Sequence, residues 1–186
     1  MPKAKSASEK DMFGHPVKKR VDKYERMLAK IDKESFQRRV ERLKFVESII
    51  GDTGLLGSIE TVFIFREAGW AYINGEFIST IILAQAFIER VFHDFMVEKG
   101  LESEARRGAQ AIIEYCRNNK LTNEFLLDKF DQLRQIRNPF VHTKSVDYQF
   151  SVGKRMAFEQ IPVNELIEKD AKDAISLMYT LLFTRL

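Results

Sequence analysis

Apolar residues recur every three to five positions along most of this chain, which is the spacing of one face of an α-helix. In residues 17–50 these positions alternate with charged ones, so we expect one long amphipathic helix, or two helices with a break near residues 33–35. The stretch 51–58, GDTGLLGS, holds three glycines in eight residues and predicts a hinge after this arm. Residues 1–16 show no periodicity and are predicted to form a disordered leader.

The most apolar part of the chain follows the glycine-rich stretch. Two helices are expected within residues 59–97, divided at Asn74–Gly75, because an Asn-Gly pair readily adopts the positive φ of a turn. The second helix, over residues 76–97, is apolar nearly all round. Such a helix is typical of the middle of a bundle or of an interface.

The rest of the chain predicts further helices joined by short loops. They are expected at about 103–118, from Thr122 onward, and from about 163 to 186. Between the last two, residues 146–152, VDYQFSV, alternate and predict either a short strand or an extended loop. The predicted fold class is therefore an all-α antiparallel helical bundle, preceded by a basic N-terminal helical arm.

Composition narrows the class of protein. The single cysteine, Cys116, excludes an internal disulfide framework and a cysteine-rich metal cluster, and it favours a reducing compartment. No run of residues reaches the roughly 18 apolar positions of a membrane span, and the N-terminus lacks the apolar core of a secretion signal. We therefore expect one domain in the cytoplasm, without membrane contact.

Positive charge is concentrated at the N-terminus. Residues 1–44 contain 14 Lys and Arg against 7 Asp and Glu, whereas residues 45–186 contain 16 against 20, so that the whole chain carries +3. A basic arm suits a phosphate backbone or an acidic protein partner. Because positive and negative charges are mixed along the arm, a solvated helix explains them equally well.

The segment LRQIRNPFVH, residues 133–142, holds the candidate chemistry. On an unbroken helix Arg137 and His142 would lie about 140° apart, from the 3.6-residue period. Pro139 disfavours helical geometry at the residue before it, so we expect the helix to stop or kink near Arg137 or Asn138. A new turn would then begin at Asn138, with exposed amides that attract phosphate. Arginine, amides and histidine together suit a phosphodiester substrate.

The motif and its neighbours resemble the HEPN superfamily of helical ribonucleases and nucleotide-binding proteins. RNPFVH, residues 137–142, fits the R-x4-6-H signature of that family in its R-N-x-x-x-H form. EAGWAYINGEFISTIILAQAFIERVF resembles the first two core helices of the family, and LLDKFDQLRQIRNPFVH and DAKDAISLMYTLL resemble the motif-bearing and closing helices. The resemblance covers about residues 56–186 and leaves the first 50 or so residues unexplained.

The resemblance implies a metal-independent endoribonuclease that acts as a homodimer, with the two motifs facing each other across the two-fold axis. A ribose 2′-hydroxyl attacks the adjacent phosphorus, a general base takes its proton, and a general acid protonates the leaving 5′-oxygen. One chain supplies one motif histidine, so two copies of His142 would act as base and acid. Arg137 would hold the phosphate, and Asn138 would cap the turn, bind phosphate, or do both. No cofactor or metal is expected.

Two polar residues on the apolar helix are supporting candidates. Gln85 and Glu89 lie one turn apart and share a face, and their burial without partners would be costly. Members of the resembled family often carry a polar or acidic residue here, so we expect a contact between Glu89 and Arg137. A hydrogen bond at an interface, without a catalytic role, explains the two residues equally well.

Two functional classes stay open at this point, with a purely structural helical adaptor that uses the basic arm as a more remote third. The first is an active ribonuclease with an RNA substrate, which in this family is often a toxin or defence effector restrained by an antitoxin or other regulatory protein. The second is a catalytically inactive HEPN-like module that binds a nucleotide or a protein partner. Cleavage of RNA by the purified chain in the presence of a chelator separates the two.

Overall fold

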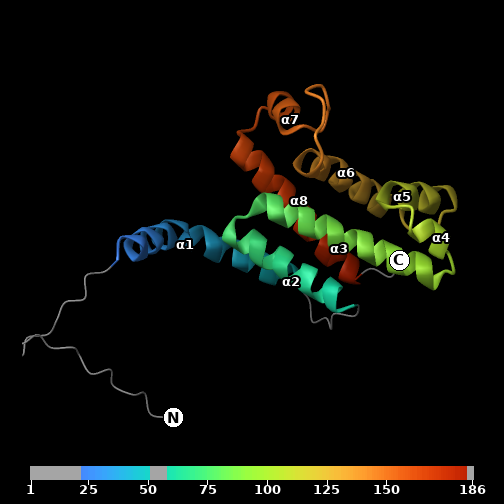
Figure 1. Cartoon of the computed structure of the whole chain (residues 1–186), viewed down its shortest axis with the longest axis horizontal. Helices are drawn as coiled ribbons and strands as arrows, with labels where there is room; N and C mark the ends of the chain where they lie inside the picture. The colour runs from blue at the N-terminus through green and yellow to red at the C-terminus, as the bar shows by residue number, and fades with distance from the viewer. Residues whose placement is uncertain (1–21, 51–57, 184–186) are drawn as a thin grey trace, which may run out of the picture. The chain divides into compact units, whose positions relative to one another are not determined.

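The computed structural model describes residues 22–50 and 58–183, and these residues form helices and short connections without any strand (Figure 1). The predicted all-α helical bundle is therefore confirmed. In chain order the helices are α1 (Lys23–Ile49), α2 (Ile59–Asn74), α3 (Phe77–Glu98), α4 (Glu102–Ala105), α5 (Ala109–Asn118), α6 (Glu124–Val141), α7 (Val152–Glu159) and α8 (Val163–Phe183).

Helix α3 lies at the centre of the bundle and packs against α2, α6 and α8 (Figure 1). This position explains its apolar character, since Phe87, Ile88 and Phe92 are all buried. Phe92 stacks on Phe130 of α6, with ring centroids 4.8 Å apart. Within the described ranges no helix combines the length and the apolar character that a membrane span requires.

The turn predicted at Asn74–Gly75 is present. Gly75 has a φ of 84°, a left-handed conformation that favours glycine, and its N–H closes the end of α2. Helix α1 is one continuous helix, without a break near residues 33–35. The predicted leader and all but the last residue of the predicted hinge at 51–58 lie outside the described residues.

Two parts of the secondary structure differ from the sequence-based prediction. The helix expected over residues 103–118 is divided into α4 and α5, because Gly108 between them takes a φ of 84°. Helix α7 was not expected. Its start is marked by Ser151, whose hydroxyl accepts the N–H of Lys154 in an ordinary N-cap. Residues 146–150 form turns, so the loop alternative applies there.

The chain divides into two units within α1, at Arg39, rather than at the glycine-rich stretch. In the second unit the end of α1 belongs to the bundle. Val46 is buried in the core, and Nε of Arg42 donates to the carbonyl of Ile73 at 3.0 Å. The compact domain thus begins well before residue 56, because α1 carries core residues on its last turns.

The end of α6 differs from what Pro139 led us to expect. Of the predicted stop or kink near Arg137 or Asn138, the stop is wrong, since α6 continues to Val141. In the last turn a proline removes only one helical hydrogen bond, the one from its own nitrogen to the carbonyl of Gln135. Oη of Tyr148 donates to that carbonyl at 3.1 Å and replaces the missing bond. The chain leaves the helix at His142, which has extended backbone angles.

We predict that the Tyr148 hydroxyl stabilises the fold only while Pro139 is present. Tyr148→Phe removes the donor to the Gln135 carbonyl and should lower the free energy of unfolding by about 1 kcal/mol. With Pro139→Ala, a backbone N–H at position 139 can serve the same carbonyl, so the same change should cost clearly less. Urea denaturation of the four proteins measures this coupling.

The matched control is Tyr24→Phe, in an exposed tyrosine of α1, which should leave the urea midpoint unchanged. If Tyr148→Phe lowers the free energy of unfolding by the same amount with and without Pro139, the proposed replacement of the helical hydrogen bond is contradicted.

Candidate functional site

Arg137 and His142 meet at the C-terminal end of α6. Nη1 of Arg137 lies 3.5 Å from Nε2 of His142. The two side chains come together without a break in the helix, because His142 has φ −135° and ψ 137° and leaves the helical path. An arginine N–H donates only to an unprotonated ring nitrogen, so this contact belongs to the neutral imidazole.

Asn138 does not begin a new turn, which corrects the second part of the prediction. Its carbonyl accepts the N–H of His142 at 2.9 Å, as an ordinary residue of α6 does. Its side-chain Oδ1 lies 3.4 Å from Nη1 of Arg137. The end of α6 therefore presents carbonyl groups instead of the expected row of amides, and a phosphate at this end depends on the Arg137 side chain.

Glu89 links three helices at this site. Its Oε2 lies 3.8 Å from Nη2 of Arg137 on α6, and its Oε1 accepts the backbone N–H of Ala109, the first residue of α5, at 3.2 Å. The expected contact between Glu89 and Arg137 is therefore present. Because 34% of the Glu89 side chain is exposed, solvent screens the ion pair, which orients Arg137 more than it stabilises the fold.

Gln85 lies one turn before Glu89 but does not reach the motif. It is fully buried, and neither Nε2 nor Oε1 of its amide has a hydrogen-bond partner in the described part of the chain. Such an amide costs roughly 1–3 kcal/mol, so the stability of the single chain does not explain this residue. The structure brings Arg137, Asn138, His142 and Glu89 together and leaves Gln85 apart from them.

A hollow of about 430 Å³ adjoins the motif. We call it the loop hollow, and it is lined by Pro139, Lys144, Ser145, Val146, Ser151, Gly153 and Lys154. The two lysines bring positive charge close to the end of α6, although Nζ of Lys154 also pairs with Asp147 at 3.3 Å. Sequence analysis missed these lysines, because their approach to Pro139 depends on how the segment after α6 folds back.

The other reactive side chains contribute little chemistry. Cys116 is buried, and burial raises the pKa of its thiol, so it offers no thiolate nucleophile. His93 lies 3.1 Å from its sequence neighbour Asp94 on the surface. Among residues 22–50 and 58–183, no three His, Cys, Asp or Glu side chains gather as ligands of a metal ion.

The site can therefore bind an anion and transfer a proton. The Arg137 guanidinium supplies positive charge and a bidentate fork, and the exposed His142 ring supplies one proton carrier. A reaction that needs both an acid and a base requires a second titratable group, which the motif of one chain does not contain. Comparisons with models of protein families, with curated proteins and with solved structures found no match.

Proposed function

We propose that this chain is a metal-independent endoribonuclease of HEPN type, which cuts RNA at a composite site between two copies. The observation that supports the proposal most is the contact of Arg137 with His142 at the exposed end of α6, with Glu89 behind the arginine. The resemblance of RNPFVH and its flanking helices to the HEPN superfamily supports it further.

In the proposed reaction His142 of one copy takes the proton of a ribose 2′-hydroxyl. The 2′-oxygen forms a bond to the adjacent phosphorus, and the bond from phosphorus to the 5′-oxygen breaks. His142 of the second copy gives its proton to the departing oxygen. The products are a 2′,3′-cyclic phosphate and a free 5′-hydroxyl, and Arg137 stabilises the negative charge of the transition state.

One observation favours a second candidate, a HEPN-like module that binds a nucleotide or protein without cleaving RNA. Arg137 already contacts Glu89, Asn138 and His142 of its own chain. A guanidinium with these partners has fewer N–H groups left for a phosphate than an unpaired one. A regulatory partner is proposed only together with the first candidate. If the chain is a toxin or defence ribonuclease, an antitoxin or other regulator restrains it.

We predict that the purified chain cuts single-stranded RNA in the presence of EDTA and leaves 2′,3′-cyclic phosphate ends. His142→Ala removes the proton carrier and Arg137→Ala removes the cation, so each should lower the cleavage rate by about 100-fold or more. Arg137→Lys should restore only part of the rate, because an ammonium lacks the bidentate fork. Gel electrophoresis of end-labelled RNA measures the rates.

Matched controls are His93→Ala, a second exposed histidine, and Arg134→Ala, an arginine one turn earlier on α6 that pairs with Asp131. Both should cleave like the parent. If His142→Ala cleaves as fast as the parent under chelator, the motif is structural and the binding-module candidate replaces the ribonuclease.

The helix over residues 76–97 was expected in the middle of a bundle or at an interface, and its central place in the bundle favours a dimer interface elsewhere on the chain. Most apolar side chains of α3 and α8 are buried within the bundle, so these helices leave little apolar surface for a partner. Exposed apolar side chains instead flank the motif histidine, with 39% of Val141 and 86% of Val146 accessible to solvent. Apolar surface beside His142 fits an interface that brings two motifs together.

We predict that the full chain is a dimer at micromolar concentration. Light scattering should give about twice the 21.7 kDa of one chain. Val146→Asp places a charge in the interface without disturbing the core, so it should yield monomers and slow cleavage. Val97→Asp, at an exposed valine near the end of α3, is the control and should leave the mass unchanged. A monomeric parent that still cuts RNA would exclude the composite site.

A further inference from the structure

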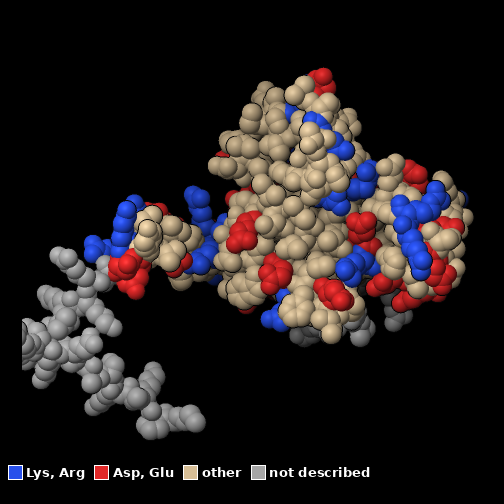
Figure 2. All heavy atoms as spheres, viewed as in Figure 1, with Lys and Arg blue, Asp and Glu red and all other residues tan. Residues whose placement is uncertain are grey.

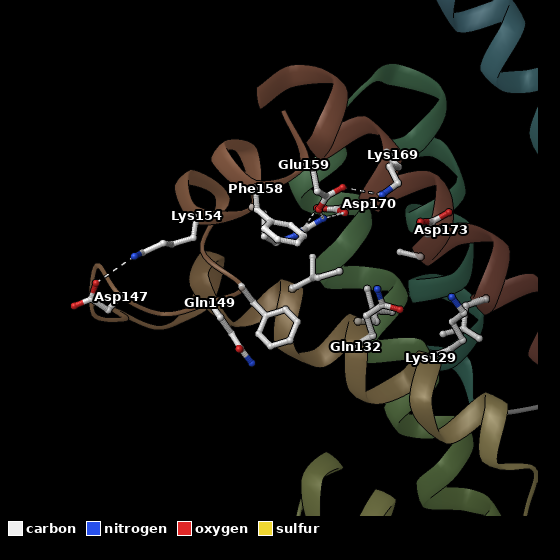
Figure 3. A pocket seen from close by; sticks show the side chains of 16 residues that line it. Lys129, Gln132, Asp147, Gln149, Lys154, Phe158, Glu159, Lys169, Asp170 and Asp173 are labelled. Atoms are coloured by element: carbon white, nitrogen blue, oxygen red, sulfur yellow. Dashed lines mark hydrogen bonds and ion pairs between the residues drawn. The ribbon is translucent and has the colours of Figure 1, made fainter. Parts of the chain in front are cut away.

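A second and larger hollow of about 630 Å³ lies between α6, α7 and α8 (Figure 3). We call it the α7 hollow. Its volume is within the range of pockets that hold small ligands. Its apolar lining comes from Leu133, Ile136, Phe150, Phe158, Ala174 and Leu177. Phe158 of α7 is 89% exposed, and Figure 2 shows that the surface over α7 carries few charged side chains.

The charged side chains around the α7 hollow neutralise one another. Six of the eight lie in ion pairs, which join Lys154 to Asp147, Arg155 to Asp170 and Glu159, and Lys169 to Glu159. The other two, Lys129 and Asp173, have opposite signs. Because no charge is left over, the apolar part of the hollow is suited to an uncharged group and not to a phosphate.

Two side-chain amides at the α7 hollow supply hydrogen-bonding groups. Gln132 of α6 and Gln149 of the segment before α7 line it. In Figure 3 these amides and the ring of Phe158 come from three different segments around the hollow. Each amide offers one acceptor and two N–H donors, which matches the edge of a nucleobase.

Lys154 connects the α7 hollow to the candidate functional site. It lines both the α7 hollow and the loop hollow, and the loop hollow also contains Pro139 and Lys144. A strand of RNA at His142 therefore meets Lys144, which suits a phosphate, before it passes Lys154 and reaches the apolar hollow.

We infer that the α7 hollow binds one unpaired nucleobase of RNA, stacked on Phe158 and hydrogen-bonded by Gln132 and Gln149. The base held there sets which phosphodiester lies at His142, so the hollow determines where the strand is cut. A base in a duplex is already stacked and paired, and the hollow therefore selects single-stranded RNA. This inference rests on the proposed ribonuclease function.

The test uses the full chain and fluorescein-labelled 2′-O-methyl RNA octamers, which cannot be cut because the attacking hydroxyl is methylated. Fluorescence anisotropy gives the dissociation constant. Phe158→Ala should weaken binding by roughly 5- to 100-fold, the range that loss of one base–aromatic stack produces. Since Phe158 is highly exposed, this variant keeps its fold. Phe63→Ala, at an exposed phenylalanine of α2, is the control and should bind like the parent.

Gln132→Ala and Gln149→Ala test the hydrogen bonds separately from the stack. With octamers of a single base, the parent should prefer one base, and each variant should reduce that preference while binding to the other bases changes little. Gln110→Ala, at an exposed glutamine of α5, should keep the preference.

The outcomes separate this inference from the ribonuclease proposal. Equal affinity of the parent and Phe158→Ala for the octamers overturns the inference, even if the chain cuts unmodified RNA. Binding that depends on Phe158 without any cleavage supports the hollow as a base site and rejects the ribonuclease. If nucleoside monophosphates bind as tightly as the octamers and show the same dependence on Phe158, the hollow serves free nucleotides and its assignment to RNA is wrong.

Discussion

Pro139 cannot donate a hydrogen bond to the carbonyl of Gln135, and much of the candidate site depends on how the chain replaces that bond. Tyr148 supplies the donor, so the segment after α6 has to turn back along the helix it has just left. This return places Lys144 beside the proline, and α7 then packs against α8. The N–H that Pro139 lacks therefore affects the path of the chain both beside His142 and at the α7 hollow.

Helix α7 is attached to the bundle mainly through charge. It contributes no buried residue, and Arg155 reaches Asp170 of α8 with two hydrogen bonds of 2.6 and 2.7 Å. Burial raises the pKa of Asp170, and the Arg155 contacts act in the opposite direction. At Asp170 the cost of desolvation therefore outweighs the attraction of Arg155, and the ion pair orients α7 on α8 more than it adds stability. Because ion pairs rather than apolar packing hold α7, its own Phe158 stays exposed to solvent.

The sequence predicted what depends on local spacing. Apolar periodicity located the helices of the bundle, and Gly75 marked a turn. The contact of Glu89 with Arg137 was expected from the resemblance to the HEPN superfamily and not from spacing. The sequence did not predict that α6 would pass through Pro139, because the compensating donor lies nine residues further along the chain. The α7 hollow was also not predicted, because it forms only when α7, which the sequence did not reveal, folds back between α6 and α8.

The contacts of Arg137 connect proton transfer to phosphate binding in the proposed reaction. While His142 is neutral, its Nε2 accepts from Nη1 of Arg137 and helps to hold the guanidinium. Once His142 has taken a proton as the base, the same approach sets two cations 3.5 Å apart and becomes repulsive. Glu89 limits how far the arginine can then retreat, because it is itself fixed by the N–H of Ala109. The guanidinium is therefore released toward the phosphate at the step in which negative charge builds up there.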